Sequence, residues 1–452
     1  MLTPKLQLSL ETMKKLLHRQ AKVNLIKIIE KLHPADIAHI FSYFTEAEQK
    51  AIFNLIENPA MAAEVLSEIE WVLGAQLLQS MDIKKTIEIL QVMPSDDAAE
   101  IISNLPEELA EKILDGMKKE DLEGVEGLLS YPEETAGRIM NPSYFALHED
   151  TTVRDAIKAV QEAADAEMVF YIYVVDDRNH LIGVLSLRQL LLVAPQKLLR
   201  DIMTVEVFSV QTHEDQEEVA KVVEKYNILA VPVVDEENKL VGVITVDDVI
   251  DILRDEATED FLKMAGTREE EFVSVDVLKI SRLRFPWLLT NLFGGLITGY
   301  FLWLFKVTIQ DVLALVTFIP VITAMGGNAG LQSSTIMIRG FATGRIAFAR
   351  LRTILFKEIR VGIIMGLACG IVVGIVGALW HGNPAIGVVV CAAMFIAISV
   401  ACTMGALVPF FFRKINIDPA IASGPFVTTA NDISGILIYM GTATIFLKYI
   451  VY

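Results

Sequence analysis

Long apolar stretches dominate the last third of the chain. They run over residues 285–305, 312–338, 361–380, 385–412 and 419–447. A helix needs about 20 apolar residues to cross a bilayer, and each stretch reaches that length. The pattern therefore predicts an α-helical transmembrane bundle of five spans over residues 285–452.

Basic residues set the orientation of these spans. Lysine and arginine precede the first span, separate the second from the third, and separate the fourth from the fifth. The opposite side carries only Lys306 and Lys448, near span ends. Loops with such an excess of positive charge stay in the cytoplasm. We therefore expect a multi-pass protein of the cell (inner) membrane, with its N-terminus in the cytoplasm and its C-terminus outside.

The fifth stretch carries one acidic residue, Asp432, near its centre. A charge in the middle of a membrane helix costs about 2.5–3.5 kcal/mol on insertion scales, so Asp432 should face the bundle interior or an aqueous cavity. Thr428 and Asn431 add polar groups beside it. The combination predicts a cation path through the membrane.

The second and fifth stretches share a motif. Pro-x-x-Thr begins at Pro320 and again at Pro425, and a glycine follows ten residues after each proline. Gly326-Gly327-Asn328 lies within the second stretch, where an interrupted helix would offer oxygen ligands to Mg²⁺ or Ca²⁺. The candidate pore residues are Asp432, Asn328, Gly327, Thr428 and Asn431. In the alternative interpretation, these glycines merely allow close packing.

The third stretch carries a glycine at every fourth position, which places these residues along one helix face. They are Gly362, Gly366, Gly370 and Gly374. Such a face lets two helices approach closely. The partner helix belongs either to a second subunit or to the same chain.

A tandem repeat occupies residues 139–253. The dipeptide Ile-Met at 139 recurs at 202, and the hexapeptide LIGVLS at 181 recurs as LVGVIT at 240. Each copy shows a first strand, a helix, two short apolar strands around an acidic turn, and a closing helix. The repeat predicts two similar α/β units.

Residues 1–138 contain short segments that begin at prolines or capping residues. The motif around His33-Pro34 recurs 60 residues later around Met93-Pro94. Helix starts of this kind at a regular spacing predict an all-α helical superhelix.

The stretch 247–264 lacks proline and has apolar residues at helical spacing, so we expect a helix that connects the repeat to the membrane. It carries only two basic residues, Arg254 and Lys263. Its seven acids are Asp247, Asp248, Asp251, Asp255, Glu256, Glu259 and Asp260. They repel one another unless counter-ions collect there, so the helix is either a solvated acidic face or a cation-binding element. We assign 254–284 to this helix and its linker.

Charge separates the two halves of the chain. The net charge is −18, but residues from 285 onward hold four acids against ten bases, whereas residues 1–284 hold 53 against 29. An acidic soluble half argues against nucleic acid as a partner, because phosphate binding requires a basic face. The N-terminus lacks the apolar core of a signal peptide, so we expect the first half to stay in the cytosol.

Cysteine and histidine usage excludes two further classes. The three cysteines all lie in apolar stretches, so no disulfide framework is expected. The seven histidines are scattered, and no nucleophile–base signature or phosphate loop is present. We therefore do not expect an enzyme.

The repeat at 139–253 resembles a CBS-domain pair, a regulatory module that commonly binds adenine nucleotides. In that family a Ser/Thr-x-x-Asp after the last strand often holds a ribose. The second copy has Thr245 and Asp248, whereas the first has Gln189 in place of the Asp. Tyr171 and Arg188 are positioned to stack on and pair with a nucleotide. The resemblance implies a ligand such as ATP, and a purely structural pair remains the alternative.

The order of parts resembles the MgtE family of magnesium channels over essentially the whole chain. The resemblance implies a homodimer in the lipid bilayer, with a Mg²⁺-selective pore lined by spans two and five and Asp432 as its main carboxylate. It further implies that Mg²⁺ bound among cytosolic acids and the connecting "plug" helix holds the pore shut. The candidate regulatory ligands are Asp96, Asp97, Asp215, Glu217, Asp247, Asp248, Asp251, Glu256, Glu259, Asp260 and Asp418. Gln216 and Asn227 lie in the same region without charge.

Two other functions fit parts of this pattern. A CBS-regulated transporter of another divalent cation or of a solute would share the architecture, although an anion pore would not carry a mid-span Asp. A membrane-tethered nucleotide sensor without transport would leave Asp432 without a purpose. The preference for Mg²⁺ over Co²⁺, Mn²⁺ or Ca²⁺ rests on the resemblance alone.

Overall fold

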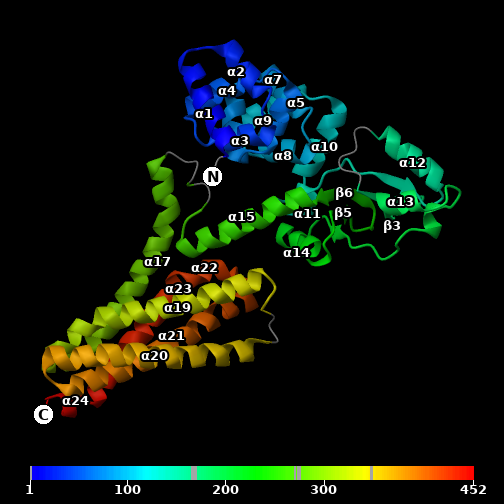
Figure 1. Cartoon of the computed structure of the whole chain (residues 1–452). Helices are drawn as coiled ribbons and strands as arrows, with labels where there is room; N and C mark the ends of the chain where they lie inside the picture. The colour runs from blue at the N-terminus through cyan, green and yellow to red at the C-terminus, as the bar shows by residue number, and fades with distance from the viewer. Residues whose placement is uncertain (1–2, 164–169, 269–270, 272–275, 347–349, 452) are drawn as a thin grey trace. The chain divides into compact units, whose positions relative to one another are not determined.

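The computed structural model describes residues 3–163, 170–268, 271, 276–346 and 350–451. The chain forms two compact units, Met1–Glu256 and Ala257–Tyr452, and each is described by itself (Figure 1). Parts of the predicted linker, 269–270 and 272–275, lie outside the described residues. The predicted combination of a helical N-terminal region, an α/β pair and a C-terminal bundle is confirmed.

The N-terminal unit begins with a run of short helices. They are α1 (Pro4–His18), α2 (Lys22–Ile29), α3 (Pro34–Phe41), α4 (Glu46–Phe53), α5 (Pro59–Ser67), α6 (Trp71–Gln79), α7 (Ile83–Leu90), α8 (Ser95–Ser103), α9 (Glu107–Gly116), α10 (Lys119–Leu129) and α11 (Ala136–Ile139). From α3 to α8, each helix packs on the next but one. The helix start predicted at Pro34 is confirmed, because α3 begins there and proline at the first helical position loses no hydrogen bond.

Two three-stranded sheets follow, one for each copy of the repeat. The first contains β1 (Ala146–His148), β2 (Tyr171–Val175) and β3 (Leu181–Ser186), and the second contains β4 (Val210–Gln211), β5 (Ala230–Val234) and β6 (Leu240–Thr245). In both sheets the first two strands are parallel and the last two antiparallel. The associated helices are α12 (Val153–Glu162), α13 (Leu187–Leu192) and α14 (Gln216–Tyr226). The repeat in sequence is therefore a repeat in fold.

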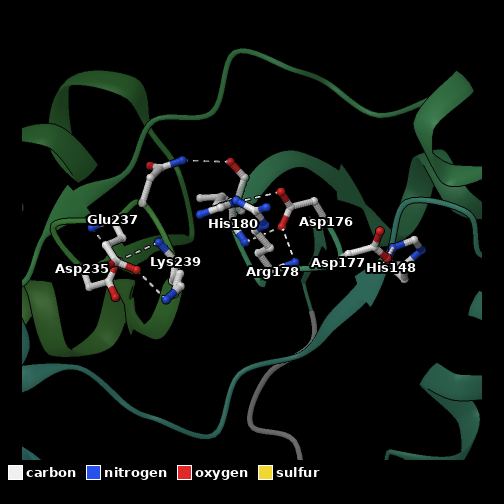
Figure 2. Close-up of polar contacts among 10 residues, drawn as sticks. His148, Asp176, Asp177, Arg178, His180, Asp235, Glu237 and Lys239 are labelled. Atoms are coloured by element: carbon white, nitrogen blue, oxygen red, sulfur yellow. Dashed lines mark hydrogen bonds and ion pairs between the residues drawn. The ribbon is translucent and has the colours of Figure 1, made fainter.

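The acidic turns between the paired strands have the same hydrogen bonds in both copies (Figure 2). Asp176 accepts backbone N–H bonds from Arg178 and His180, each at 2.8 Å. Asp235, 59 residues later, accepts backbone N–H bonds from Glu237 and Lys239, at 2.9 and 2.8 Å. His180 also bonds the second oxygen of Asp176, and this bond is the main reason that the pKa of Asp176 falls to about 2. These turns are structural, since their carboxylates are already used locally.

Helix α15 (Val246–Ala265) matches the predicted connecting helix at 247–264. It is continuous over 20 residues, and the division between the two units falls within it. The predicted acids lie along this helix, with Asp247 and Asp248 in its first turn, where negative charge is favourable.

The second unit is a bundle of long helices joined by shorter ones. They are α17 (Val277–Leu304), α18 (Lys306–Asp311), α19 (Ile319–Ala342), α20 (Leu351–His381), α21 (Pro384–Lys414), α22 (Pro419–Ser423), α23 (Pro425–Ile445) and α24 (Leu447–Val451), with a 3₁₀ segment over Leu313–Phe318. Among the described residues, four helices are long and apolar enough to cross a membrane, over Val277–Leu304, Leu313–Ala342, Leu351–His381 and Pro384–Lys414. Helix α23 is not one of these four, so the fifth span stays a prediction.

The backbone of the second and fifth stretches corrects one expectation. Helix α19 runs without interruption through Gly326-Gly327-Asn328, so the backbone carbonyls there are engaged in the helix and are not free ligands. The cost of two glycines, about 1 kcal/mol each, is small beside the packing of a long helix. The irregular backbone lies earlier, in the 3₁₀ segment before Pro320 and at Gly424, which separates α22 from α23. Proline follows each irregularity, as expected for a residue that begins helices but cannot continue them.

The glycine stripe of the third stretch packs within the chain. A Cβ at Gly366 or Gly370 would lie 2.7 Å from a backbone oxygen of α21, on Phe395 and Cys391 respectively. Gly362 and Gly374 lie equally close to α21. The stripe therefore allows α20 and α21 to approach closely inside one subunit, and it no longer indicates a dimer contact.

Candidate functional site

Asp432 lies on a face of α23 that meets the second predicted span. Thr428, Asp432, Gly435 and Tyr439 recur at helical spacing along one side of α23. Ile322 of α19 lies 3.9 Å from the position that a Cβ on Gly435 would take. The Tyr439 hydroxyl donates to the Leu315 carbonyl at 2.9 Å. The stripe that carries Asp432 therefore faces the segment 315–322.

A second contact joins α19 and α23, at Gly330 and Asn431. A Cβ on Gly330 would overlap the Asn431 amide, and one on Gly405 of α21 would overlap the Gly330 carbonyl. Gly326 lies between Ile322 and Gly330 on α19, and a Cβ there would meet nothing within 4 Å. The two helices thus touch at both ends of a short open space, and Gly326 borders this space.

The remaining pore candidates are spread over this region. Asp432 is half-buried and Asn328 is exposed, and Gly327 also has open space beside it. The Thr428 hydroxyl donates to the Gly424 carbonyl of its own chain segment at 2.8 Å. Asn431 is 2 % exposed, and within the described part of the chain neither its Nδ2 nor its Oδ1 has a hydrogen-bond partner.

Lys263 lies between two acids that the sequence predicted as Mg²⁺ ligands, Glu259 and Asp418. Its ammonium lies 2.6 Å from a Glu259 oxygen, one turn earlier on α15, and 3.1 Å from an Asp418 oxygen. Asp418 also caps α22 by accepting the Ala420 N–H at 2.8 Å. Burial lowers the pKa of Lys263, but its hydrogen bonds to both carboxylates outweigh this effect, so the net pKa is raised. The lysine is therefore firmly charged.

Trp287 of α17 packs against two glycines, Gly266 and Gly424. Gly266, with φ +75°, ends α15 in the left-handed conformation that favours glycine. A side chain at Gly266 would overlap the Trp287 ring, and so would one at Gly424, where α22 meets α23. The end of α15 and the start of α23 therefore contact the same indole.

Other acids of α15 are bonded to neutral partners. Glu256 accepts from the Gln216 amide at 2.7 Å, so the uncharged residue noted in the sequence binds a predicted ligand directly. Asp248 accepts the Thr245 hydroxyl at 2.6 Å and caps the helix start. Burial raises the pKa of Asp248, and Asp247 adds to this effect against the Thr245 bond. Burial, followed by repulsion from Asp251, also raises the pKa of Asp255.

The acids predicted elsewhere in the N-terminal unit have local partners as well. Asp97 accepts the Ser67 hydroxyl at 2.5 Å, and Asp96 accepts from the Asn141 amide at 3.5 Å. Asp215 caps α14. Glu217 lies 3.1 Å from the Lys221 ammonium. Within the described ranges, no three His, Cys, Asp or Glu side chains gather closely enough to hold a metal.

The nucleotide candidates lie at the junction of the two repeat copies. The Leu229 N–H donates to the Tyr171 hydroxyl at 3.4 Å, and the Leu229 carbonyl accepts from Val246 N–H at 2.9 Å, next to Thr245. Tyr171 and Thr245 are therefore brought close together across the two copies. Arg188 is exposed on α13. The Asp248 carboxylate, predicted to hold a ribose, bonds Thr245 instead.

Sequence reasoning missed two polar contacts in the second unit. Lys263 was counted only as a weak counter-charge on an acidic helix, because its partner Asp418 is far away in sequence. Glu358 entered the sequence analysis only as one of the four acids after residue 285, yet it is 4 % exposed and accepts the Ser333 hydroxyl at 2.7 Å. A period of four along α20 could have indicated that Glu358 shares the glycine face, because Gly362 follows it by one turn.

These features define the class of the protein: a multi-pass membrane protein with an N-terminal helical domain and a CBS-type regulatory pair. Family models match each part in turn. They are the MgtE intracellular N domain at 32–134, the CBS domain at 136–195 and 199–255, and the divalent cation transporter MgtE at 319–442. The family suggested by the sequence is therefore the one that matches.

Curated relatives extend this match over most of the chain. The magnesium transporter MgtE of Bacillus subtilis is 35% identical over 421 residues, which is 93% of each chain. MgtE of Thermus thermophilus is 39% identical over 330 residues, or 72% of each chain. The chain belongs to the MgtE family of magnesium transporters. It is accordingly a membrane transporter and not an enzyme.

Solved structures resemble the N-terminal part. The soluble part of a magnesium transporter aligns with a TM-score of 0.50 and 31% identity, over 56% of this chain and 99% of that one. The cytosolic domain of the Mg²⁺ channel MgtE in complex with ATP aligns with a TM-score of 0.51 and 34% identity, over 54% of this chain and 99% of that one.

Proposed function

We propose that the protein conducts Mg²⁺ across the cell membrane and that Mg²⁺ in the cytoplasm closes it. The observation that carries the proposal is Asp432 itself, the one acid of α23, half-buried on the face of that helix that meets the second span. A carboxylate costs free energy in a membrane helix unless it faces polar surroundings or an ion. Family membership supports Mg²⁺ as that ion.

In this proposal Asp432 attracts the ion, and Thr428, Asn431, Gly327 and Asn328 line its path. Mg²⁺ keeps most of its water and binds proteins through one or two carboxylates, so a single acid per chain is sufficient. Because α19 is regular through 326–328, its glycines contribute space for a hydrated ion, and Asn328 contributes a side-chain amide. This role replaces the backbone carbonyl ligands expected from sequence.

We further propose a homodimer, in which two copies of Asp432 share one path. Asn328 is exposed and Asp432 is only half-buried within a single chain, which suits residues that a second copy completes. Two facing carboxylates repel when no ion is present and bind a divalent ion together. Light scattering of the detergent-solubilised protein measures this state directly, and a fully active monomer would contradict it.

The gate in this proposal is α15 and its neighbours. Lys263 already joins Glu259 on α15 to Asp418 at the start of the fifth span, so part of the closed contact needs no metal. The other acids of α15 and of α8 and α14 gain counter-ions when cytoplasmic Mg²⁺ rises, which lowers their repulsion in the compact state. Differential binding of a few kcal/mol is enough to shift a two-state gate.

A nucleotide modulates this gate in the same proposal. The ATP-bound relative and the proximity of Tyr171 to Thr245 support a site between the two CBS copies. Asp248 would exchange its Thr245 hydrogen bond for a ribose hydroxyl. Equilibrium dialysis with labelled ATP, on wild type and on Tyr171→Ala, tests this part separately from transport.

Flux into liposomes tests the main proposal. Vesicles that hold a Mg²⁺-sensitive dye and the purified protein should fill when external Mg²⁺ is added, and vesicles without protein should not. Parallel assays with Ca²⁺, Co²⁺ and chloride distinguish the alternative of another cation or solute. Absence of Mg²⁺ flux from correctly inserted protein would reject the proposal.

A further inference from the structure

Glu358 and Asp432 are the two acids within the described long helices α17, α19, α20, α21 and α23 of the second unit, and neither the pore nor the gate accounts for Glu358. It lies on α20, seven residues after the start of that helix, and is 4 % exposed. Its Oε2 accepts the Ser333 hydroxyl of α19 at 2.7 Å. Its other oxygen lies 3.7 Å from the ammonium of Lys357, which is itself largely exposed.

A buried carboxylate in a membrane helix requires compensation. An ion pair with an exposed lysine contributes little, because solvent screens it. A hydrogen bond to an ionised acceptor is roughly twice as strong as a neutral one, and a low dielectric strengthens it further. The Ser333–Glu358 bond is therefore the main described interaction that holds this charge, and it is an interaction between α19 and α20.

Ser333 belongs to the helix that carries the predicted pore segment. It lies seven residues after Gly326 on the same side of α19, since positions i and i+7 share a helix face. Between them, Gly330 packs against Asn431 and Gly405. The rotation of α19 about its axis is thus fixed at Gly330 by α21 and α23, and at Ser333 by Glu358.

We propose that Glu358 is a positioning residue for transport: through Ser333 it sets the rotation of α19 and so the separation of Gly326 from the helix α23 that carries Asp432. This inference rests on the proposed Mg²⁺ path. A helix rotated about its axis moves Gly326 and Asn328 relative to α23. A cation that passes with its water is sensitive to such a change in width.

A double-mutant cycle tests the pair in the full-length protein in liposomes. The variants are Glu358→Ala, Ser333→Ala, the two combined, and Glu358→Gln, which keeps an oxygen acceptor for the Ser333 hydroxyl. Ser399→Ala is the matched control, because among the described residues this half-buried hydroxyl on α21 bonds only the Phe395 carbonyl of its own helix. Each variant is assayed for Mg²⁺ flux per folded protein, for the ratio of Ca²⁺ to Mg²⁺ flux, and for melting temperature.

We expect Glu358→Ala and Ser333→Ala each to reduce Mg²⁺ flux about tenfold and to raise the Ca²⁺ to Mg²⁺ ratio several-fold. The double variant should be no worse than either single one, because both remove the same bond. Glu358→Gln should keep at least half of the wild-type flux, and Ser399→Ala should match wild type.

Three results would overturn the inference. The first is a lower melting temperature with unchanged flux and selectivity per folded protein, which shows a purely structural role. The second is full additivity of the two alanine variants. The third is a loss in Glu358→Gln equal to that in Glu358→Ala, which shows that the charge itself is needed. If wild type conducts Mg²⁺ while any of these holds, only this inference fails; if wild type does not conduct, the proposed function fails.

Discussion

Acidic residues differ sharply between the two parts of this molecule. Residues 1–284 hold 53 of the 57 acids, and several acids of the N-terminal unit bond a neutral side chain, such as Ser67 for Asp97 or Gln216 for Glu256. The membrane unit holds few acids, and each has a distinct environment. Asp432 is half-buried on α23, Glu358 is buried and bonds Ser333, and Asp418 binds Lys263.

The difference shows that the number of carboxylates does not define a site. In water an extra acid costs little and a lone ion pair contributes less than about 1 kcal/mol, so a crowded acidic surface acts only through the sum of many weak terms. In a membrane a single acid costs several kcal/mol and has to be held by specific neighbours. We therefore expect single substitutions to matter in the membrane unit and combined ones in the N-terminal unit.

The largest effect should follow from Asp432→Asn. The change removes the charge that attracts the ion but keeps the shape, and losing one partner of a desolvated charge pair costs about 2–5 kcal/mol. We expect Mg²⁺ flux in liposomes to fall by about a hundredfold or more. Asp311→Asn is the matched control, because this acid is exposed at the end of α18. Wild-type flux in Asp432→Asn would remove Asp432 from the path.

A combined neutralisation should separate gating from conduction. Asp248, Asp251, Glu256 and Glu259, changed together to Asn or Gln, leave too little negative charge on α15 for Mg²⁺ to collect there. We expect the Mg²⁺ concentration that halves the flux to rise about tenfold or more, with the maximal flux unchanged. Four equivalent changes at Glu107, Glu108, Glu111 and Asp115 on α9 serve as the control. An equal shift in the control would show that only total charge matters.

Lys263→Gln should give a smaller shift in the same direction. Without its ammonium, Glu259 and Asp418 face each other uncompensated, and closure then depends on Mg²⁺ at this point. A partly exposed ion pair contributes about 0.2–1 kcal/mol, so the half-closing concentration should rise about two- to fivefold. Lys158→Gln, which removes a lysine paired one turn away with Glu162 on α12, is the control. An unchanged concentration would show that the Lys263 contact plays no part in closure.

The smallest effect concerns pH and stability without Mg²⁺. Burial is the first cause of the raised pKa of Glu100, Asp248 and Asp255, so the folded state binds their protons more tightly than the unfolded chain does. Their contribution to stability therefore falls as pH rises through the folded pKa values and is lowest near pH 7. We expect the melting temperature to rise by a few degrees from pH 7 to pH 5.

Asp176 provides the internal comparison for this prediction. Its pKa lies at about 2, so its stabilisation is present above the ordinary value of 3.8 and is lost only as pH falls below that value. It cannot contribute to a change between pH 7 and pH 5. The triple variant Glu100→Gln, Asp248→Asn, Asp255→Asn should lose the rise, and an undiminished rise would assign it to other groups.

Local patterns were sufficient for much of the fold. The repeat predicted an acidic turn in each copy, and Asp176 and Asp235 indeed accept the same backbone N–H bonds, because a turn depends on only four or five neighbouring residues. The connecting helix and the proline-led helix starts also follow from short-range effects. The glycine run at 326–328 misled the prediction, because tertiary packing kept that helix regular despite its weak propensity.

By itself, the sequence determined where apolar and acidic residues concentrate, which segments repeat, and that one carboxylate lies within a predicted membrane span. These properties depend on residue type and spacing along one element. Only the tertiary structure decided which partner each charged group meets: Lys263 with Asp418, Glu358 with Ser333, and the glycine stripe of α20 with α21. Such partners are far apart in the chain, and their contact depends on how helices rotate and pack, which no local pattern specifies.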